Sequence, residues 1–186
     1  GNAGINRLAK CEKFDLHDNN KILNFCLKKK IDLVVPGSEE FLARGVSDYL
    51  RLNNIKVFGP SKKSSLLESS KIFTKQVCKL GKISTANWQT LENYKEALNK
   101  IKVLKFPLVI KLDKLAAGKG VLVAKSYKEA KEFLSKIGSG KIGNNKSKIL
   151  IEKKLVGKEA SFFFVVDGET SRFIGSAQDY KRAKEN

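Results

Sequence analysis

Apolar residues in the first third of the chain alternate between helical and strand-like spacing. Ile22, Leu23, Cys26 and Leu27 form one stripe of an amphipathic helix, and helical spacing recurs in the segment EEFLARGVSDYLRLNN. Two short apolar runs, IDLVVPG and IKVFGP, follow these helices, and each ends in adjacent proline and glycine residues. Strand, helix and strand at this spacing predict a βαβ unit with a parallel sheet.

The apolar pattern after residue 60 predicts helices first and then mostly strands. Residues 61–84 and 91–104 have helical spacing, and Ser126 with Glu129 has the spacing of a capping box that opens another helix. Strands are predicted in FPLVIKLDK, VLVAK, KILIEKKL and ASFFFVVDGETSRFIGSA, where Asp167-Gly168 is a hairpin signal. The pattern as a whole predicts a parallel α/β piece, a helical connector and an α+β piece.

The composition is typical of a globular protein without a membrane anchor. Of the 186 residues, 41% are hydrophobic and 9% are aromatic, which argues against disorder. No apolar run approaches the ~18 residues of a membrane-spanning helix, and the start has no signal-peptide pattern. Cys11, Cys26 and Cys78 are widely spaced and odd in number, which favours reduced thiols and a cytoplasmic location.

The formal charge of +18 would suit a nucleic-acid-binding protein, because phosphate backbones attract clustered cations. Only five of the 37 basic residues are arginine, however, and arginine is the better residue for bidentate phosphate or base recognition. The chain has no RNP-type aromatic motif, zinc-ligand set or helix-turn-helix signature. A general lysine bias explains the charge better, so we do not expect nucleic acid as a partner; the basic-protein alternative rests on charge alone.

The segment KLAAGKGVLVAK, residues 114–125, has the composition of a loop that holds phosphate. It is not a P-loop, because Gly120 rather than Ser or Thr follows Lys119, and a strand rather than a helix comes next. It is not a dinucleotide fingerprint either, because Val123 stands where the third glycine would be. The pattern is strand, glycine loop and strand. A plain hairpin turn and a flexible loop that closes over phosphates both remain open.

Three charged residues, one before this loop in the chain and two downstream of it, are candidates for a nucleotide site. Lys111 lies inside an apolar strand, where it either meets an anion or faces solvent. Glu152 ends an apolar strand and Glu159 follows it, so their carboxylates could accept hydrogen bonds from a sugar hydroxyl or an exocyclic amine. Edge strands also carry such residues without a function, so each signal alone is weak.

Several longer segments together resemble one known family. GNAGI, FGPSKKSSLLESSKIFTK, ISTANWQT, FPLVIKLDKLAAGKGVLVAKS, ILIEKKLVGKEASFFFVVDG and AQDYKR fall in the order and spacing of the glycinamide ribonucleotide synthetase (phosphoribosylamine–glycine ligase) family of the ATP-grasp superfamily. The resemblance covers essentially the whole chain. The glycine-loop block alone would leave other ATP-grasp ligases open.

The resemblance implies an incomplete parallel-sheet N-terminal domain, followed by the small lobe and the start of the large lobe of an ATP-grasp domain. Residues 1–60 would be a partial α/β domain for phosphoribosylamine, and residues 61–86 a helical connector. Residues 87–155 would form the small lobe with the glycine loop, and residues 156–186 the truncated start of the large lobe.

The resemblance also implies a nucleotide site. Lys71 and Lys111 would contact the phosphates of ATP, the glycine loop would close over them, the backbone after Glu152 would hold the adenine edge, and Glu159 would bind the ribose. The ATP-binding residues implied are Lys71, Lys111, Gly118, Lys119, Gly120, Val121, Glu152, Lys153, Leu155 and Glu159. The substrate-binding residues implied are Gly1, Asn2, Gly4, Glu39, Asp179, Lys181 and Arg182.

The family joins glycine to phosphoribosylamine in purine synthesis, and the resemblance carries this reaction over as an expectation. ATP would convert the carboxylate of glycine to an acyl phosphate, and the amine would then displace phosphate. Mg²⁺ or Mn²⁺ would bridge the ATP phosphates, with ligands expected outside this chain. The full-length enzyme is expected to be a cytoplasmic monomer without a membrane partner. A different ATP-grasp carboxylate–amine ligase is the alternative.

The chain departs from the family pattern at several positions. Tyr180 stands where the family has histidine, Lys114 replaces a glycine, and the turn GSEEFL lacks both usual prolines. The opening G-N-G-G-R-E-H-A block, the later G-P-N-T-G-G-M-G segment and the downstream acidic metal ligands do not occur in the chain. It begins at Gly1 and contains no methionine. We therefore expect an internal fragment that turns over poorly or not at all, and we assign no catalytic residue within it.

Overall fold

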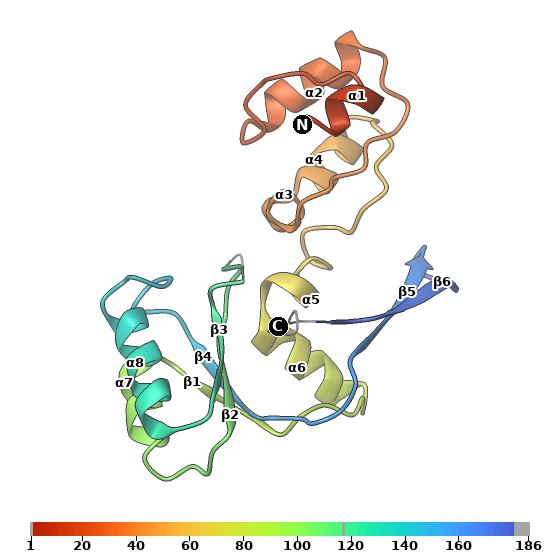
Figure 1. Ribbon diagram of the computed structural model, residues 1–186. Helices are drawn as coiled ribbons and strands as arrows, with labels where there is room; N and C mark the ends of the chain where they lie inside the picture. Colours follow the sequence, from red (N-terminus) through yellow and green to blue (C-terminus); the bar gives the residue numbers. More distant parts are fainter. Residues whose placement is uncertain (1, 117, 181–186) are drawn as a thin grey trace. The chain divides into compact units, whose positions relative to one another are not determined.

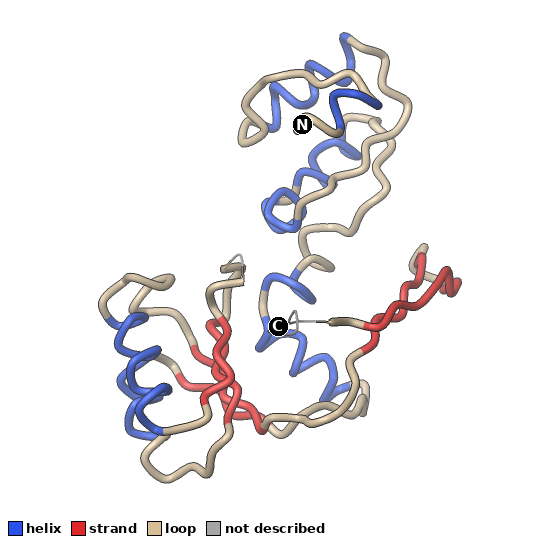
Figure 2. Tube along the Cα trace, viewed as in Figure 1, coloured by secondary structure: helices blue, strands red, loops and turns tan. Residues whose placement is uncertain are grey.

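The computed structural model describes residues 2–116 and 118–180 of the chain (Figure 1). The chain divides into two compact units, Gly1–Lys153 and Lys154–Asn186, which are described separately below. Helices predominate in the first half of the first unit, and the strands follow from residue 88 onward (Figure 2).

The N-terminal part of the first unit contains four short helices. They are α1 (Ile5–Leu8), α2 (Asn19–Lys28), α3 (Glu39–Arg44) and α4 (Val46–Leu52). Of these, α2, α3 and α4 pack around a small core. A parallel bridge joins Val34 to Val57, so the two predicted strands run side by side in the predicted direction but are only a single bridge long. The buried core residues here are Ile22, Cys26, Val46, Leu50 and Ile55.

The single helix predicted over residues 39–54 is two helices. Gly45 separates α3 from α4 and has a φ of 93°, a left-handed conformation that glycine adopts at little cost. It ends α3, because its backbone N–H donates to the carbonyl of Leu42. The uniform helical prediction was wrong at this point because the apolar spacing continues across the break.

The prediction of one continuous helix over residues 61–84 was also wrong. The segment contains α5 (Leu66–Ser69) and α6 (Lys71–Leu80), with Ser70 extended between them. The Ser70 hydroxyl accepts a hydrogen bond from the Phe73 N–H at 3.1 Å. Ser70 therefore caps a new helix instead of continuing the old one, as serine favours helix N-termini over helix interiors.

The rest of the first unit is a four-stranded antiparallel sheet with two helices. The strands are β1 (Trp88–Leu91), β2 (Leu108–Leu112), β3 (Val121–Ala124) and β4 (Ile149–Lys153), in the order β1-β4-β2-β3. The helices α7 (Tyr94–Lys100) and α8 (Tyr127–Gly138) pack together on the sheet (Figure 1). Strand β1 was not predicted, because WQTL is too short to show a period.

The strand–glycine loop–strand prediction is confirmed. Strands β2 and β3 pair antiparallel, with Leu108 opposite Ala124 and Lys111 opposite Val121. Strand β4 pairs with β2 on its other side. The capping spacing of Ser126 is confirmed as well, because its hydroxyl accepts from the Glu129 N–H at 3.3 Å.

The second unit is a hairpin of β5 (Ala160–Val166) and β6 (Ser171–Gln178), paired antiparallel. The turn lies where Asp167-Gly168 predicted it: Asp167 Oδ1 accepts from the N–H groups of Glu169 and Thr170. These hydrogen bonds lower the pKa of the Asp167 carboxyl.

Two further observations bear on the predictions from composition. In the described part of the chain, no helix has the length and apolar character needed to cross a membrane. The three cysteines are free thiols, and burial raises the pKa of Cys26.

Candidate functional site

The candidate site lies on the face of the four-stranded sheet that α7 and α8 leave open. Side chains alternate between the two faces of a strand, and in β2 the buried residues Leu108, Ile110 and Leu112 belong to the core with those helices. Lys111 therefore points to the other face. Val109 is opposite Glu152 in the register, so Lys111 and Glu152 are diagonal neighbours on that face.

Glu152 is the centre of a buried charge cluster. Its Oε2 lies 3.1 Å from the Nζ of Lys111, and its Oε1 lies 3.2 Å from the Nζ of Lys75. The Glu152 side chain is 6% exposed, and that of Lys111 is 28% exposed. One carboxylate thus faces two ammonium groups, which leaves a net positive charge that attracts an anion. Of the two alternatives for Lys111, an anionic partner and a solvent-facing position, the structure thus shows the anionic partner.

Lys75 was missed in the sequence analysis. Its ammonium is buried on α6, where it also donates to Thr85 Oγ1 and lies 3.4 Å from the carbonyl oxygen of Ala86. Its contact with Glu152 Oε1 is an ion pair that does not have the geometry of a hydrogen bond. The available signal was its spacing, because Lys71 and Lys75 are four residues apart and lie on one side of a helix.

Lys71 is the first residue of α6, beside the glycine loop. Its Nζ donates to the carbonyl oxygen of Lys114 at 2.8 Å. Burial lowers the pKa of the Lys71 ammonium from the ordinary 10.5; Asp113 and Glu68 oppose this shift, and Lys111 adds to it. The charges of Lys71 and Lys111 therefore act on each other.

Asp113 connects α6 to the end of β2. Its two carboxylate oxygens each accept from the Ser70 hydroxyl at 3.1 Å, and Oδ1 also accepts from the Ile72 N–H at 3.0 Å. Asp113 was not predicted as a site residue. No local pattern could identify this contact, because its partners are more than 40 residues away in sequence.

The glycine loop is tightly closed at its base. The Leu112 N–H donates to the carbonyl of Gly120 at 2.7 Å, and the Lys119 N–H donates to that of Ala116 at 2.8 Å. A Cβ on Gly120 would lie 2.7 Å from the Cβ of Ala116, so only glycine fits there. Val121 begins β3 opposite Lys111, which places the loop directly beyond that lysine.

A hollow of about 710 Å³ brings several of the predicted residues together. Lys71, Glu39 and the glycine-loop residues Gly118, Gly120 and Val121 all line it. Its remaining lining residues are Ser38, Glu40, Glu68, Leu115 and Ala116. A residue predicted to lie near substrate thus shares a hollow with residues predicted to hold phosphate.

Other predicted residues lie elsewhere in the chain. Asn2 Oδ1 accepts from the Ile5 N–H at 3.0 Å, and Gly4 precedes α1. Lys153 ends β4, where its N–H donates to the Asn87 carbonyl.

The described part of the second unit holds three of the predicted residues. Leu155 is exposed there, and the Asp179 N–H donates to the carbonyl of Glu159 at 2.9 Å. Asp179 Oδ2 accepts from the Ser161 hydroxyl at 2.8 Å. The predictions for Gly1, Lys181 and Arg182 lie outside the described residues.

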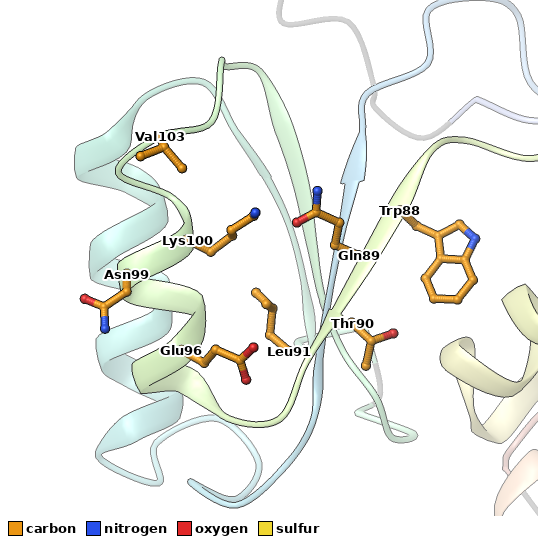
Figure 3. A pocket seen from close by; sticks show the side chains of 8 residues that line it. All are labelled: Trp88, Gln89, Thr90, Leu91, Glu96, Asn99, Lys100 and Val103. Carbon is orange, nitrogen blue, oxygen red and sulfur yellow. The ribbon is translucent and has the colours of Figure 1, made fainter.

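A second hollow, of about 690 Å³, lies between β1 and α7 (Figure 3). Its lining residues are Trp88, Gln89, Thr90, Leu91, Glu96, Asn99, Lys100 and Val103. None of these is a predicted site residue. A hollow by itself therefore does not distinguish the candidate face, and the charge cluster and the glycine loop are the features that do.

The described residues do not provide a metal site. Within residues 2–116 and 118–180, no three His, Cys, Asp or Glu side chains are grouped closely enough to hold an ion. We therefore assign no residue of the described chain to the magnesium that the resemblance implies.

Comparison with known proteins identifies the family. The N domain of phosphoribosylglycinamide synthetase matches residues 1–68, and the ATP-grasp (A) domain of the same enzyme matches residues 69–186. The chain belongs to the phosphoribosylglycinamide synthetase family. Its fold is thus that of the ATP-grasp ligases, which confirms the predicted fold class.

Individual relatives agree with this family. The chain is 39% identical to a phosphoribosylamine–glycine ligase of Caldanaerobacter subterraneus subsp. tengcongensis over 100% of its length and 45% of the relative's. It is 43% identical to the ligase of Mesorhizobium japonicum over 98% of its length and 43% of the relative's. The crystal structure of the Thermotoga maritima ligase matches with a TM-score of 0.74 and 34% identity, over 98% of this chain and 43% of that one. The chain thus spans somewhat less than half the length of these relatives.

Proposed function

We propose that this chain provides the nucleotide-binding lobe of an ATP-dependent ligase that joins glycine to 5-phosphoribosylamine. The products would be glycinamide ribonucleotide, ADP and phosphate. The observation that carries the proposal is the convergence of Lys71, Lys111 and the glycine loop in a chain of this family. The family relatives named above are phosphoribosylamine–glycine ligases, which supports this pair of substrates over another carboxylate and amine.

The charge of the site suits the triphosphate of ATP. Two ammonium groups and the backbone N–H groups of a glycine loop offset negative charge that builds up on transferring phosphoryl oxygens. Because Lys111 is only 28% exposed, its field is less screened than that of a surface lysine. The loop would cover the phosphates and exclude water, which protects an acyl phosphate from hydrolysis.

The chemical steps follow from the poor reactivity of a carboxylate. A carboxylate oxygen of glycine attacks the γ-phosphorus of ATP, and ADP leaves with the electrons of the broken P–O bond. The amine of phosphoribosylamine then attacks the carbonyl carbon of glycyl phosphate, phosphate leaves, and the nitrogen loses a proton. Magnesium, when bound with ATP, neutralises phosphate charge. The lysines described here bind and orient the phosphates.

The remaining assignments belong to the same proposal. We place Lys153 and Leu155 at the adenine edge, Glu159 at the ribose, and Asn2, Gly4, Glu39 and Asp179 near the other substrates. We propose that the domains of the chain divide after residues 60, 86 and 155. We also propose that the full-length enzyme is a cytoplasmic monomer. The free thiols of the three cysteines support the cytoplasmic assignment.

Calorimetric titration of the 186-residue chain with ATP tests the nucleotide site. We expect saturable binding that Lys111→Ala weakens and that Lys128→Ala, on the exposed surface of α8, leaves unchanged. A protein that contains the remaining family segments should release ADP only when both glycine and phosphoribosylamine are present. Equal turnover with another amine would favour a different ATP-grasp ligase.

A further inference from the structure

Asp113 holds the chain on both sides of Lys71. Its carboxylate accepts hydrogen bonds from the side chain of Ser70, the residue before Lys71, and from the backbone N–H of Ile72, the residue after it. The three distances are 3.0–3.1 Å, which is ordinary hydrogen-bond geometry. The backbone of Lys71 is therefore fixed at two adjacent points by one side chain.

Asp113 is itself fixed to the sheet that carries the other phosphate lysine. It comes two residues after Lys111 in the chain, and its own N–H donates to the carbonyl of Lys148 at 3.0 Å. The Asp113 carboxylate thus connects the start of α6 to the end of β2. Since Lys71 begins that helix and Lys111 lies in that strand, this carboxylate links the two elements that carry the lysines.

We propose that Asp113 is a positioning residue that holds Lys71 and Lys111 at the spacing needed to bind one triphosphate. This inference rests on the proposed function, in which these lysines bind ATP. Asp113 does not itself bind phosphate, because one carboxylate would repel another anion, and its oxygens are already engaged by Ser70 and Ile72.

The charge of Asp113 has a second effect at the same position. The charged groups that face Lys71 are Asp113, Glu68 and Lys111. Burial disfavours the ammonium form of Lys71, and the negative charge of Asp113 raises its pKa against that effect. Removal of the charge should therefore lower the pKa of Lys71 further, an effect that a purely structural contact would not produce.

Hydrogen exchange of the chain without nucleotide tests the contact directly. In Asp113→Ala the Ile72 amide loses its acceptor, and we expect its exchange to accelerate at least tenfold. Asp113→Asn keeps an acceptor oxygen, so the exchange rate of the Ile72 amide in this variant should stay closer to that of the parent. Asp32→Asn, on an exposed loop, serves as the matched control. Unchanged exchange at Ile72 in Asp113→Ala would overturn the proposed contact, whether or not the chain binds ATP.

Calorimetric titration with ATP at several pH values tests the positioning role. Asp113→Ala should weaken binding about tenfold at neutral pH, the loss expected when a hydrogen bond to a charged group is removed. Asp113→Asn should bind nearly as well at neutral pH but lose affinity at a lower pH than the parent does. Parental affinity and pH dependence in both variants would overturn the role of Asp113. Absence of binding by the parent chain would instead overturn the proposed nucleotide site.

Discussion

Lys111 of β2 and Glu152 of β4 form an ion pair of 3.1 Å on the face of the sheet opposite α7 and α8. Lys75 approaches the same carboxylate from α6, at 3.2 Å. A cation that would otherwise be costly to bury is thus stabilised before any ligand arrives, yet the cluster keeps an excess positive charge.

Replacement of Lys111 by alanine should weaken ATP binding by at least tenfold. The ammonium is partly buried and next to the glycine loop, so its attraction to phosphate is weakly screened. Calorimetry measures the effect. Folding should be affected less than binding, because Glu152 retains Lys75; urea unfolding of the same variant checks this. Binding as tight as that of the parent would contradict the assignment of Lys111.

Replacement of Glu152 by alanine should reduce the free energy of unfolding by about 3 kcal/mol, the loss typical when one partner of a buried ion pair is removed. Two ammonium groups would then face each other without a carboxylate. Urea denaturation measures the change. In the Glu152→Gln background, Lys75→Met should destabilise much less than it does alone, because the lysine no longer has a charge partner. Additive effects in this double-mutant cycle would show that the two side chains are not coupled.

As the pH rises, the affinity for ATP should begin to fall at a lower pH than it would with a lysine of ordinary pKa. Burial lowers the pKa of Lys71 below 10.5, so the ammonium that binds phosphate is lost at a lower pH. For folding the sign is opposite: the penalty for a buried ammonium applies below the folded pKa and is relieved as the pH rises toward the unfolded value. Lys71→Arg should remove the dependence of ATP affinity on this group, because arginine stays charged. A parental pH profile in Lys71→Arg would exclude Lys71 as the titrating group.

Replacement of Gly120 by alanine should disturb the glycine loop. The new Cβ would lie 2.7 Å from Ala116 and 3.3 Å from Leu112, so the loop has to shift. We expect a loss of roughly 1–3 kcal/mol in stability and weaker ATP binding. Gly175→Ala is the matched control, because nothing lies within 4 Å of its added Cβ. Thermal unfolding and ATP titration of both variants make the comparison, and equal behaviour would contradict a tightly packed loop.

The sequence predicts three of the four strands of the sheet (β2, β3 and β4), because apolar runs and a glycine loop are local signals. It placed Lys111 in a strand, and the register then brought it to Glu152. It failed at Ser70 and Gly45, where apolar spacing continues through a break in the helix. In both cases one residue's backbone or capping preference outweighed the periodic pattern.

The parts of the site that the sequence did not reveal depend on contacts between distant residues. Asp113 binds Ser70 and Ile72, and Lys75 binds Thr85 and faces Glu152. Each of these residues is a common polar type in an ordinary local context. Their contacts appear only when α6 is packed against the sheet; the four-residue spacing of Lys71 and Lys75 indicates a shared side of a helix but not the partner on the sheet.

The Lys75–Glu152 pair also limits how this part of the protein can move. If α6 separated from the sheet, Glu152, whose side chain is 6% exposed in the packed state, would lose one of its two cationic neighbours. Helix α6 and the sheet should therefore move as one rigid body when nucleotide binds and is released. Any flexing in this unit should be concentrated in segments that carry no buried charge.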